Sequence, residues 1–168
     1  MILPRADLVG WFRRLNAFPM GSRALDRVLW RVVPFNKMLR PHLVSATREE
    51  VRVELKLRKS LHNHLDSMHA AALVSVGEYA QALLIVANAE GLGAEVILAR
   101  LTVDYLAKAR GDVVSTARMT DAARRAVKEG LGRGENVELS VQSVITDAGT
   151  GLELARLKGS WRARAPRP

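Results

Sequence analysis

Cysteine is absent from the 168 residues of this sequence. Without thiols the chain can have neither disulfide bonds nor thiolate chemistry. This absence is consistent with a reducing compartment, and we expect a cytoplasmic protein. Long hydrophobic runs are also absent, because none reaches the roughly 18 apolar residues that span a bilayer. Charged residues interrupt the apolar positions of residues 1–16, so we expect no signal peptide there.

Acidic residues are fewer than basic ones: 17 Asp and Glu stand against 26 Lys and Arg, and the net charge is +9. The basic excess belongs to the two ends. Residues 1–47 carry eight basic and two acidic residues, and residues 151–168 carry five and one. Such ends attract nucleic acid, anionic lipid or a polyphosphate ligand, or they form an ordinary solvated surface. No DNA-reading motif is present, so we expect no nucleic acid as a partner.

Residues 1–47 are predicted to form an arm of two short amphipathic helices. Apolar residues recur with helical spacing over Leu8–Leu15 and Leu25–Val32, and Ser22 is a suitable N-cap for the second helix. The other face of that helix carries a basic stripe, which consists of Arg23, Arg27 and Arg31. We expect the arm to pack on the body; the alternative is that it lies on a membrane surface.

Residues 48–163 are predicted to form one α+β domain, followed by a disordered tail at 164–168. Alternating apolar and polar residues predict five strands, over residues 49–59, 97–107, 112–119, 137–145 and 152–163. A helix over residues 68–86 is apolar on nearly every face and should be buried. A shorter helix over residues 121–129 is capped by Thr120. We expect an antiparallel sheet with the long helix on its concave face.

The predicted central helix carries one acid, Glu78, near its middle. Burying an unpaired charge is costly, so this carboxylate needs a reason to be there. It is a candidate general base or nucleophile, and an apolar setting should raise its pKa. The alternative is a structural role, in which Glu78 accepts hydrogen bonds from a loop or a partner helix. Tyr79, beside it, either contacts substrate or belongs to the core or an interface.

A polar, histidine-rich loop precedes that helix. Its possible metal ligands are His62, His64, Asp66 and His69. Their spacing matches no strong ligand pattern, so we expect no metal site. Asp66 or Ser67 is expected to be the N-cap of the helix. His69 is either a histidine satisfied by the backbone or a contact for substrate.

The order of arm, strand, buried helix and consecutive strands resembles the hotdog fold, in which a curved antiparallel sheet wraps a central helix. Hotdog thioesterases of the phenylacetyl-CoA type carry a pattern N-x-x-G-x-x-H-G-G, with a carboxylate nine residues after the histidine. Asn63, His69 and Glu78 match the Asn, His and carboxylate positions of this pattern. The segment Leu101–Gly111 is also similar to the long strand of a bacterial hotdog family of unknown function, which has a basic helical arm.

Two features depart from the pattern. Asp66 stands where the motif has its first glycine, and Ala70-Ala71 replaces the glycine pair. Glycine lets a backbone approach a ligand closely, so two methyl groups and a carboxylate narrow the access of a thioester. The backbone N–H groups survive the change.

The resemblance implies hydrolysis of an acyl thioester carried by coenzyme A or by an acyl carrier. In that reaction Glu78 activates water or attacks the carbonyl carbon itself. The N–H groups of Ala70 and Ala71, at the start of the helix, form the oxyanion site. Asn63 orients the substrate or the water, and the expected substrate contacts are His69, Asp66 and Tyr79. No metal or organic cofactor is needed, apart from the coenzyme A of the substrate.

Helix geometry bears on the oligomeric state. The nine residues from His69 to Glu78 span about 13–14 Å of helix and about half a revolution. One chain therefore cannot bring Glu78 and the Ala70 N–H group to the same carbonyl. Two antiparallel central helices can, and the hotdog resemblance likewise implies a dimer. We expect a homodimer or a dimer of dimers whose sites are shared between chains.

Other functions stay open at this point. The departures from the pattern favour a non-catalytic hotdog protein that binds acyl-CoA or lipid. The basic ends favour a protein that associates with a membrane surface through residues 1–47. A dehydratase of the hotdog type is a weaker third alternative, because its paired Asp and His pattern is not evident.

Overall fold

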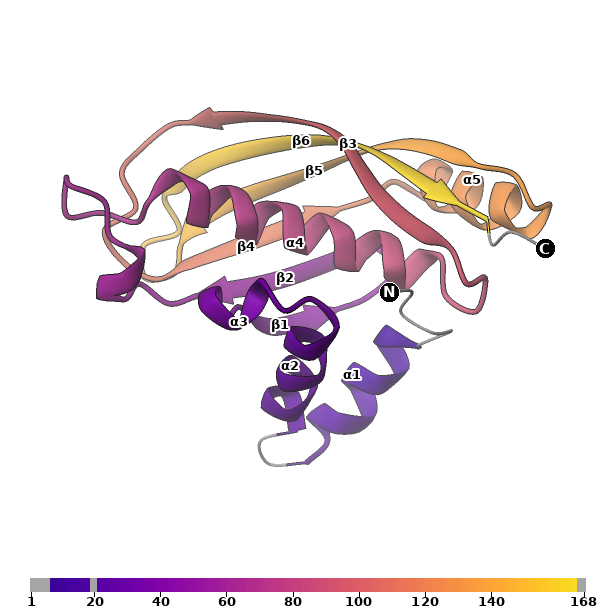
Figure 1. Cartoon of the computed structure of the whole chain (residues 1–168), viewed down its shortest axis with the longest axis horizontal. Coiled ribbons are helices and arrows are strands. Elements are labelled where there is room, and N and C mark those ends of the chain that lie inside the picture. The colour runs from indigo at the N-terminus through magenta and orange to yellow at the C-terminus, as the bar shows by residue number, and fades with distance from the viewer. Residues whose placement is uncertain (1–6, 19–20, 166–168) are drawn as a thin grey trace.

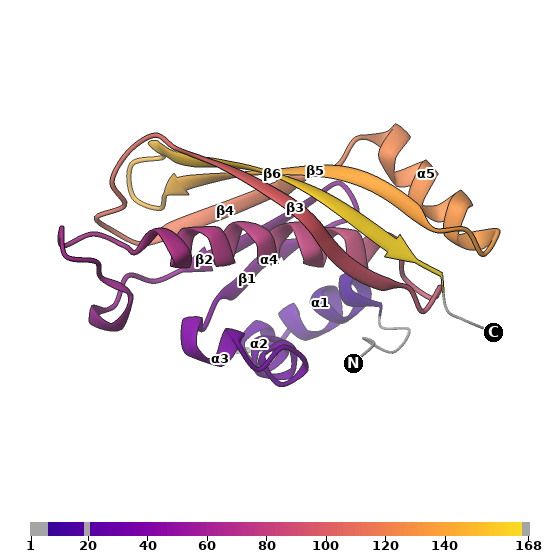
Figure 2. The ribbon, with the colours of Figure 1, turned by 45° about the horizontal axis from the view of Figure 1, so that its top comes forward.

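The computed structural model describes residues 7–18 and 21–165. In this part of the chain, a six-stranded sheet curves around one long helix, and the N-terminal helices pack beside β1 (Figure 1, Figure 2). The helices are α1 (Leu8–Asn16), α2 (Gly21–Val32), α3 (Asn36–Leu39), α4 (Ala70–Asn88) and α5 (Asp121–Gly132). The strands are β1 (His42–Ala46), β2 (Glu50–Leu55), β3 (Glu95–Tyr105), β4 (Val113–Arg118), β5 (Val137–Asp147) and β6 (Glu153–Arg164).

Neighbouring strands of the sheet are antiparallel, in the order β1-β2-β4-β5-β6-β3. The alternation of the sequence produces this sheet, as β2 illustrates: Val51 and Val53 are buried, whereas Arg52 between them is exposed. The five predicted strands are confirmed as β2 to β6. The sequence did not predict β1, which lies inside the segment that we assigned to the arm.

Helix α4 lies along the concave face of the sheet and fills the core (Figure 2). It is long and apolar enough to match a membrane span, but most of it is buried inside this domain. The helix carries a half-buried stripe, which contains Val74, Glu78, Ala82 and Val86. The predicted α+β hotdog fold, with its central helix, is confirmed.

The start of α4 differs from the prediction. Its N-cap is His69, whose Nδ1 accepts a hydrogen bond from the N–H group of Ala71 at 3.1 Å. Asp66 or Ser67 as the N-cap is therefore wrong. Asp66 instead has a left-handed backbone with φ of 53°, and the Ser67 hydroxyl is bonded to Asn63. These residues form the turn that leads into the helix.

Helices α1 and α2 confirm the two predicted helices of the arm, and α3 adds a single short turn. Ser22 is not an N-cap, because it lies within α2, which already includes Gly21. At the other end of the chain, β6 continues through Arg164, the first residue of the predicted tail. The predicted tail beyond residue 165 and the first six residues of the arm lie outside the described residues.

The arm covers the β1 edge of the sheet through one buried acid. Asp26, on α2, accepts a hydrogen bond from the N–H group of Leu43 at 2.9 Å. Its second oxygen lies 2.6 Å from Nδ1 of His42. An edge strand otherwise leaves such N–H groups without protein partners. Asp26 therefore ties the arm to the sheet and satisfies part of this edge.

A buried polar network joins α4 to strands β5 and β6. Gln81 is fully buried, and its Nε2 donates to Oγ of Ser143 at 3.0 Å. Trp161 Nε1 donates to Oε1 of Gln81 at 2.8 Å, and Ser143 Oγ donates to the carbonyl of Gly77 at 3.1 Å. Gly159 leaves room for this network, since a Cβ there would collide with Gln81 and Trp161. The paired groups fix the position of the helix on the sheet.

Candidate functional site

Glu78 faces an apolar cavity of about 410 Å³ between α4, the end of α2 and the first half of β3. Its other walls include one further acid, Glu95, and the apolar residues Val32, Val33, Ala82, Val86, Val96, Ile97, Leu98 and Trp161. Within the described residues, the carboxylate of Glu78 has neither a hydrogen bond nor an ion pair. Burial among these side chains raises the pKa of Glu78 above its ordinary value. A raised pKa makes a carboxylate a stronger base, which suits a general base.

The start of α4 presents one free donor rather than the two that were predicted. Ala70 and Ala71 are both exposed, but the N–H group of Ala71 donates to His69 Nδ1. The N–H group of Ala70, at the first helical position, has no partner inside the helix. The helix dipole favours negative charge at this point. Ala70 is therefore the better placed oxyanion donor, and Ala71 becomes available only if the His69 ring turns away.

Asn63 organises the loop before α4. Its Oδ1 accepts from the N–H groups of Leu65 at 2.9 Å and Ser67 at 3.2 Å, and also from the Ser67 hydroxyl. Its own N–H group donates to the carbonyl of Ser67 at 2.8 Å. These bonds leave the side-chain NH₂ as the group that Asn63 can offer to a ligand.

Asp66 lies on the exposed tip of the same loop. Its Oδ1 is 2.8 Å from Nδ1 of His62. Its φ of 53° is the left-handed conformation that glycine adopts most easily and that Asp tolerates better than most residues. This explains in physical terms why the resembled motif has glycine here.

Tyr79 belongs to the core. Its side chain is only 6% exposed, on a different face of α4 from the cavity of Glu78. Burial raises the pKa of Tyr79, and the negative charges of Asp26 and Glu78 raise it further. The structure therefore does not bring Tyr79 to the site residues, although it is next to Glu78 in the sequence.

The candidate residues lie at two places along α4. Near the start of the helix, the hydroxyl of Tyr105 donates to the carbonyl of Ala70 at 3.4 Å, so this end lies beside the end of β3. Glu78 lies farther along, where the cavity is lined by the beginning of β3. Ala70 and Glu78 are about 12 Å apart along the helix axis, so one chain does not bring them to a single carbonyl.

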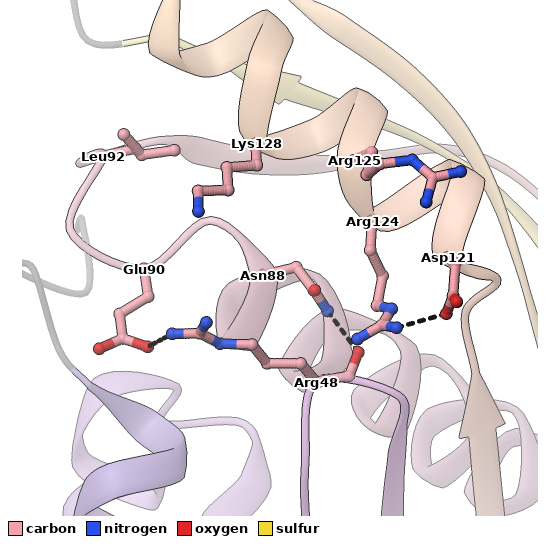
Figure 3. A pocket seen from close by; sticks show the side chains of 8 residues that line it. All are labelled: Arg48, Asn88, Glu90, Leu92, Asp121, Arg124, Arg125 and Lys128. Carbon is pink, nitrogen blue, oxygen red and sulfur yellow. Dashed lines mark hydrogen bonds and ion pairs between the residues drawn. The ribbon is translucent and has the colours of Figure 1, made fainter.

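A second cavity, of about 330 Å³, lies between the end of α4, Arg48 and α5 (Figure 3). Two of its four lining cations are paired with acids among the described residues. Arg48 pairs with Glu90 at 3.2 Å, and Arg124 pairs with Asp121 and Glu49. Asn88 closes the floor by donating to the carbonyl of Arg48. Throughout the described part of the chain, no three His, Asp or Glu side chains are arranged to hold a metal ion.

Sequence reasoning missed the residues that build the walls of the Glu78 cavity. Val32 and Leu98 are far apart in the chain, and nothing in their local pattern shows that they meet. Asp26 was also missed, although a charged residue next to Leu25 on the apolar face of a helix is an available signal.

Residues 21–161 match the family described as a domain of unknown function, DUF4442. The chain belongs to this family. The DUF4442 match begins at α2 and ends in β6, so it includes α2 and α3 together with the sheet. No curated protein is significantly similar to the chain in sequence.

Solved structures place this DUF4442 protein in the hotdog fold. A candidate thioesterase from Shewanella oneidensis has a TM-score of 0.75 and 16% identity, over 86% of this chain and 97% of that one. A candidate thioesterase from Pseudomonas aeruginosa has a TM-score of 0.73 and 22% identity, over 89% and 97%. A thioesterase family protein from Silicibacter pomeroyi has a TM-score of 0.68 and 14% identity, over 84% and 96%. At these identities the likeness concerns the fold.

Proposed function

We propose that the protein hydrolyses acyl thioesters, with Glu78 as the reacting carboxylate. The observation that carries this proposal is an unpaired carboxylate in an apolar cavity, at a position that matches the thioesterase pattern. The names of the structural neighbours from Shewanella oneidensis and Silicibacter pomeroyi support the same class of reaction. The substrate is an acyl group on coenzyme A or on an acyl carrier, and no other cofactor takes part. The cytoplasm stays our expected location.

In the proposed mechanism, the carboxylate of Glu78 takes a proton from a water molecule as the water oxygen attacks the thioester carbonyl carbon. Negative charge develops on the carbonyl oxygen, and the N–H group of Ala70 from a second copy of the chain stabilises it with the helix dipole behind it. The tetrahedral intermediate then breaks its C–S bond. The departing thiolate receives the proton that Glu78 holds. The alternative first step is direct attack by Glu78, with a mixed anhydride that water later hydrolyses.

The other predicted site residues have supporting roles in this proposal. The side-chain NH₂ of Asn63 orients the substrate from the loop. His69 fixes the start of the helix, and it could also contact substrate if its ring leaves Ala71. Asp66, on the exposed loop tip, stays a prediction as a substrate contact. Tyr79 also stays a prediction, but its burial in the core speaks against contact with substrate.

The proposed site is completed by a second copy of the chain. The β3 edge of the sheet has no neighbouring strand within residues 7–18 and 21–165, and it is eleven residues long. Antiparallel pairing of two β3 strands brings the Tyr105 end of one copy beside the Val96 end of the other. Ala70 lies beside Tyr105, and Glu78 lies beside Val96. Wherever the Tyr105 end of one β3 meets the Val96 end of the other, the Ala70 N–H group of one copy therefore lies on the same side as the Glu78 carboxylate of the other. A homodimer or a dimer of dimers follows.

Active-site complementation tests the shared site. Glu78→Gln removes the base, and Ala70→Pro removes one N–H group at the helix position where proline is best tolerated. His69 before it already has ψ of 138°, which suits the residue preceding proline. We expect each variant alone to be inactive. Reassembled mixtures should recover about a quarter of wild-type activity, because half of the dimers are mixed and each has one intact site.

The controls are Ala70→Gly, which keeps the N–H group and should retain activity, and separate unfolding curves for each variant. A mixture that stays inactive, although mixed dimers form, contradicts the shared site. Wild-type protein without activity on a broad panel of acyl-CoA thioesters contradicts the enzymatic proposal itself.

A non-catalytic protein that binds acyl-CoA or lipid is the second candidate. The observation that favours it is the bond from Ala71 N–H to His69, which leaves a single donor at the helix start. Turnover of acyl-CoA by the wild type, and its loss in Glu78→Gln while binding measured by calorimetry survives, distinguishes the enzyme from the binding protein. Binding by both proteins without turnover by the wild type favours the non-catalytic candidate.

Membrane-surface association is the remaining candidate, and exposed apolar residues of the arm favour it. Phe18 is 68% exposed, Met38 67% and Phe35 55%. Such side chains beside cations suit an anionic bilayer surface. Flotation with anionic vesicles tests this, using the double variant Phe35→Ser and Met38→Ser. Absence of wild-type protein from the floating fraction contradicts the candidate.

A further inference from the structure

A cavity of about 550 Å³ lies where α2 meets the outer side of β1 and β2. We call it the cationic pocket, after the residues that line it: Arg23, Arg27, Arg40, Lys56, Arg58, Trp30, His42, Asp26 and Glu54. Its size is in the range of small-molecule sites. It is separate from the Glu78 cavity, and no residue lines both.

The cations of this pocket have no acidic partners. Among the residues that the structure describes, neither Lys56 nor any of the four arginines of the pocket forms an ion pair. In the cavity of Figure 3, by comparison, Arg48 and Arg124 are paired with acids, whereas Arg125 and Lys128 are not paired within the described part of the chain. Five positive charges around one concavity repel one another, which costs stability unless an anion binds there. The charge pattern therefore points to an anionic ligand.

The two acids of the pocket do not neutralise it. Asp26 is buried and already holds His42 and the N–H group of Leu43. It fixes the His42 ring by accepting from Nδ1, so that Nε2 remains available to a ligand. Glu54 is the only other acid among the lining residues. A net positive concavity remains.

Arg58 is held in place at the wall of this pocket. Its Nη2 donates to the carbonyls of Met38 at 3.1 Å and Leu39 at 2.5 Å, which fixes the guanidinium. Its Nε is buried and has no hydrogen-bond partner among the described residues, as is also the case for Nε of Arg124. Because solvent does not reach this Nε, Arg58 contributes a fixed positive charge to the wall of the pocket rather than a free donor.

Arg40 adds a cation at a conformational cost. It follows α3 with φ of 51°, in the left-handed region where helices usually end on glycine. A long side chain in this position is unfavourable for the backbone, but it brings a guanidinium to the pocket. Strain of this kind is often found at ligand sites.

We propose that the cationic pocket binds a soluble ligand that carries at least two phosphate groups. Guanidinium groups bind phosphate oxygens through paired, charge-assisted hydrogen bonds, and five cations exceed what one phosphate needs. Trp30 supplies a flat wall, because its Nε1 donates to the carbonyl of Pro41 at 3.0 Å and the indole is thereby held. A base or other planar group stacks on such a surface. The ligand class is a nucleoside bisphosphate or diphosphate.

The phosphorylated nucleoside of coenzyme A is the source that agrees with the enzymatic proposal, and this identification rests on that proposal. The phosphate site itself does not, because its binding is measurable without any thioester. Adenosine 3′,5′-bisphosphate and inorganic pyrophosphate are therefore the probes. Their binding also separates a failure of the pocket from a failure of the hydrolase proposal.

Isothermal titration of the full chain tests the pocket. We expect adenosine 3′,5′-bisphosphate to bind, with an affinity that falls as salt is added. Arg27→Gln should weaken binding about tenfold, since it removes a charge-assisted contact. Arg40→Gly should weaken it similarly without lowering stability, because glycine suits this backbone conformation. Arg31→Gln on the same helix and Arg52→Gln on β2 are matched controls outside the pocket and should bind as wild type does.

Kinetics connect the pocket to the reaction. For an acyl-CoA, Arg27→Gln should raise KM and leave kcat unchanged, because it removes binding that ground and transition states share. For the corresponding acyl-pantetheine, which has no nucleotide, KM should not change.

Three results overturn the proposal. The first is an absence of binding by both soluble probes. The second is that the wild type binds phosphatidic acid vesicles but neither soluble probe, and that Arg27→Gln no longer binds the vesicles. This result assigns the pocket to a lipid headgroup instead. Equal effects of Arg27→Gln and Arg31→Gln would also remove the pocket, because a diffuse basic surface then explains the binding.

Discussion

The carboxylate of Glu78 is surrounded by apolar side chains, so its protonation is coupled to folding. Burial raises the pKa of Glu78 in the folded chain above its ordinary value of 4.5. The native protein therefore binds this proton more tightly than the unfolded chain does. The stability that results is fully present below the ordinary pKa, and it is lost as the pH rises through the raised value.

Replacement of this carboxylate should show that dependence. Glu78→Gln should be more stable than the wild type near neutral pH, because it removes an unfavourably buried charge. Below pH 4.5 the two proteins should be about equally stable, since Glu78 is then protonated. Urea unfolding at both pH values measures this, with exposed Glu129→Gln as control. If Glu78→Gln is more stable than the wild type by the same amount at both pH values, the coupling of Glu78 protonation to folding is contradicted.

The backbone at Asp66 makes a second prediction. Its φ of 53° is accessible to glycine at little cost, whereas alanine is disfavoured there. We expect Asp66→Ala to be about 1 kcal/mol less stable than Asp66→Gly, since both variants lose the bond to His62 but only one keeps the strain. Denaturant midpoints compare the pair. Equal midpoints mean that the loop relaxes into another conformation.

At the scale of elements, the contact between α4 and the sheet depends on Gly159. Its missing side chain leaves the space that Gln81 and Trp161 occupy. We expect Gly159→Ala to lower the free energy of unfolding by about 2 kcal/mol through overpacking. Gly132→Ala is the control, because open space surrounds that position; it should change stability by less than about 0.5 kcal/mol. Chemical denaturation of both variants measures the difference.

Helices and strands whose apolar residues recur at a regular spacing were predictable from the sequence, and those without such a spacing were not. Strands β2 to β6 and helix α4 follow directly from where their apolar residues recur. Strand β1 has only five residues, and its assignment depends on pairing with β2 and on Asp26 from the arm. The cap of α4 was missed because histidine is not among the preferred N-cap residues.

The candidate site was predictable in part for the same reason. Asn63, His69 and Glu78 fall at a recognisable spacing within one continuous segment. The cavity and the cationic pocket are built from α2, β1, β2 and β3, and residues as distant as Arg23 and Arg58 meet only in the fold. No local pattern contains that information.

At the scale of the whole molecule, we expect an aspartate introduced on edge strand β3 to affect dimerisation and an aspartate introduced on edge strand β1 not to. Ile97 on β3 is 38% exposed and Val44 on β1 is 39% exposed. We expect Ile97→Asp to yield a monomer, because a buried carboxylate opposes pairing of two β3 strands. Val44→Asp should leave the dimer intact. Light scattering after size exclusion measures the masses, and a monomeric wild type contradicts the proposed interface.

The covered β1 edge also limits how large an assembly can grow. A sheet with two free edges can add copies at both sides and extend without end, as fibrils do. Here Asp26 and α2 occupy one edge, so a copy that pairs through β3 has no further strand to offer. In the proposed β3-paired dimer, the arm therefore ends β-sheet association at two copies, through the same helix that lines the cationic pocket.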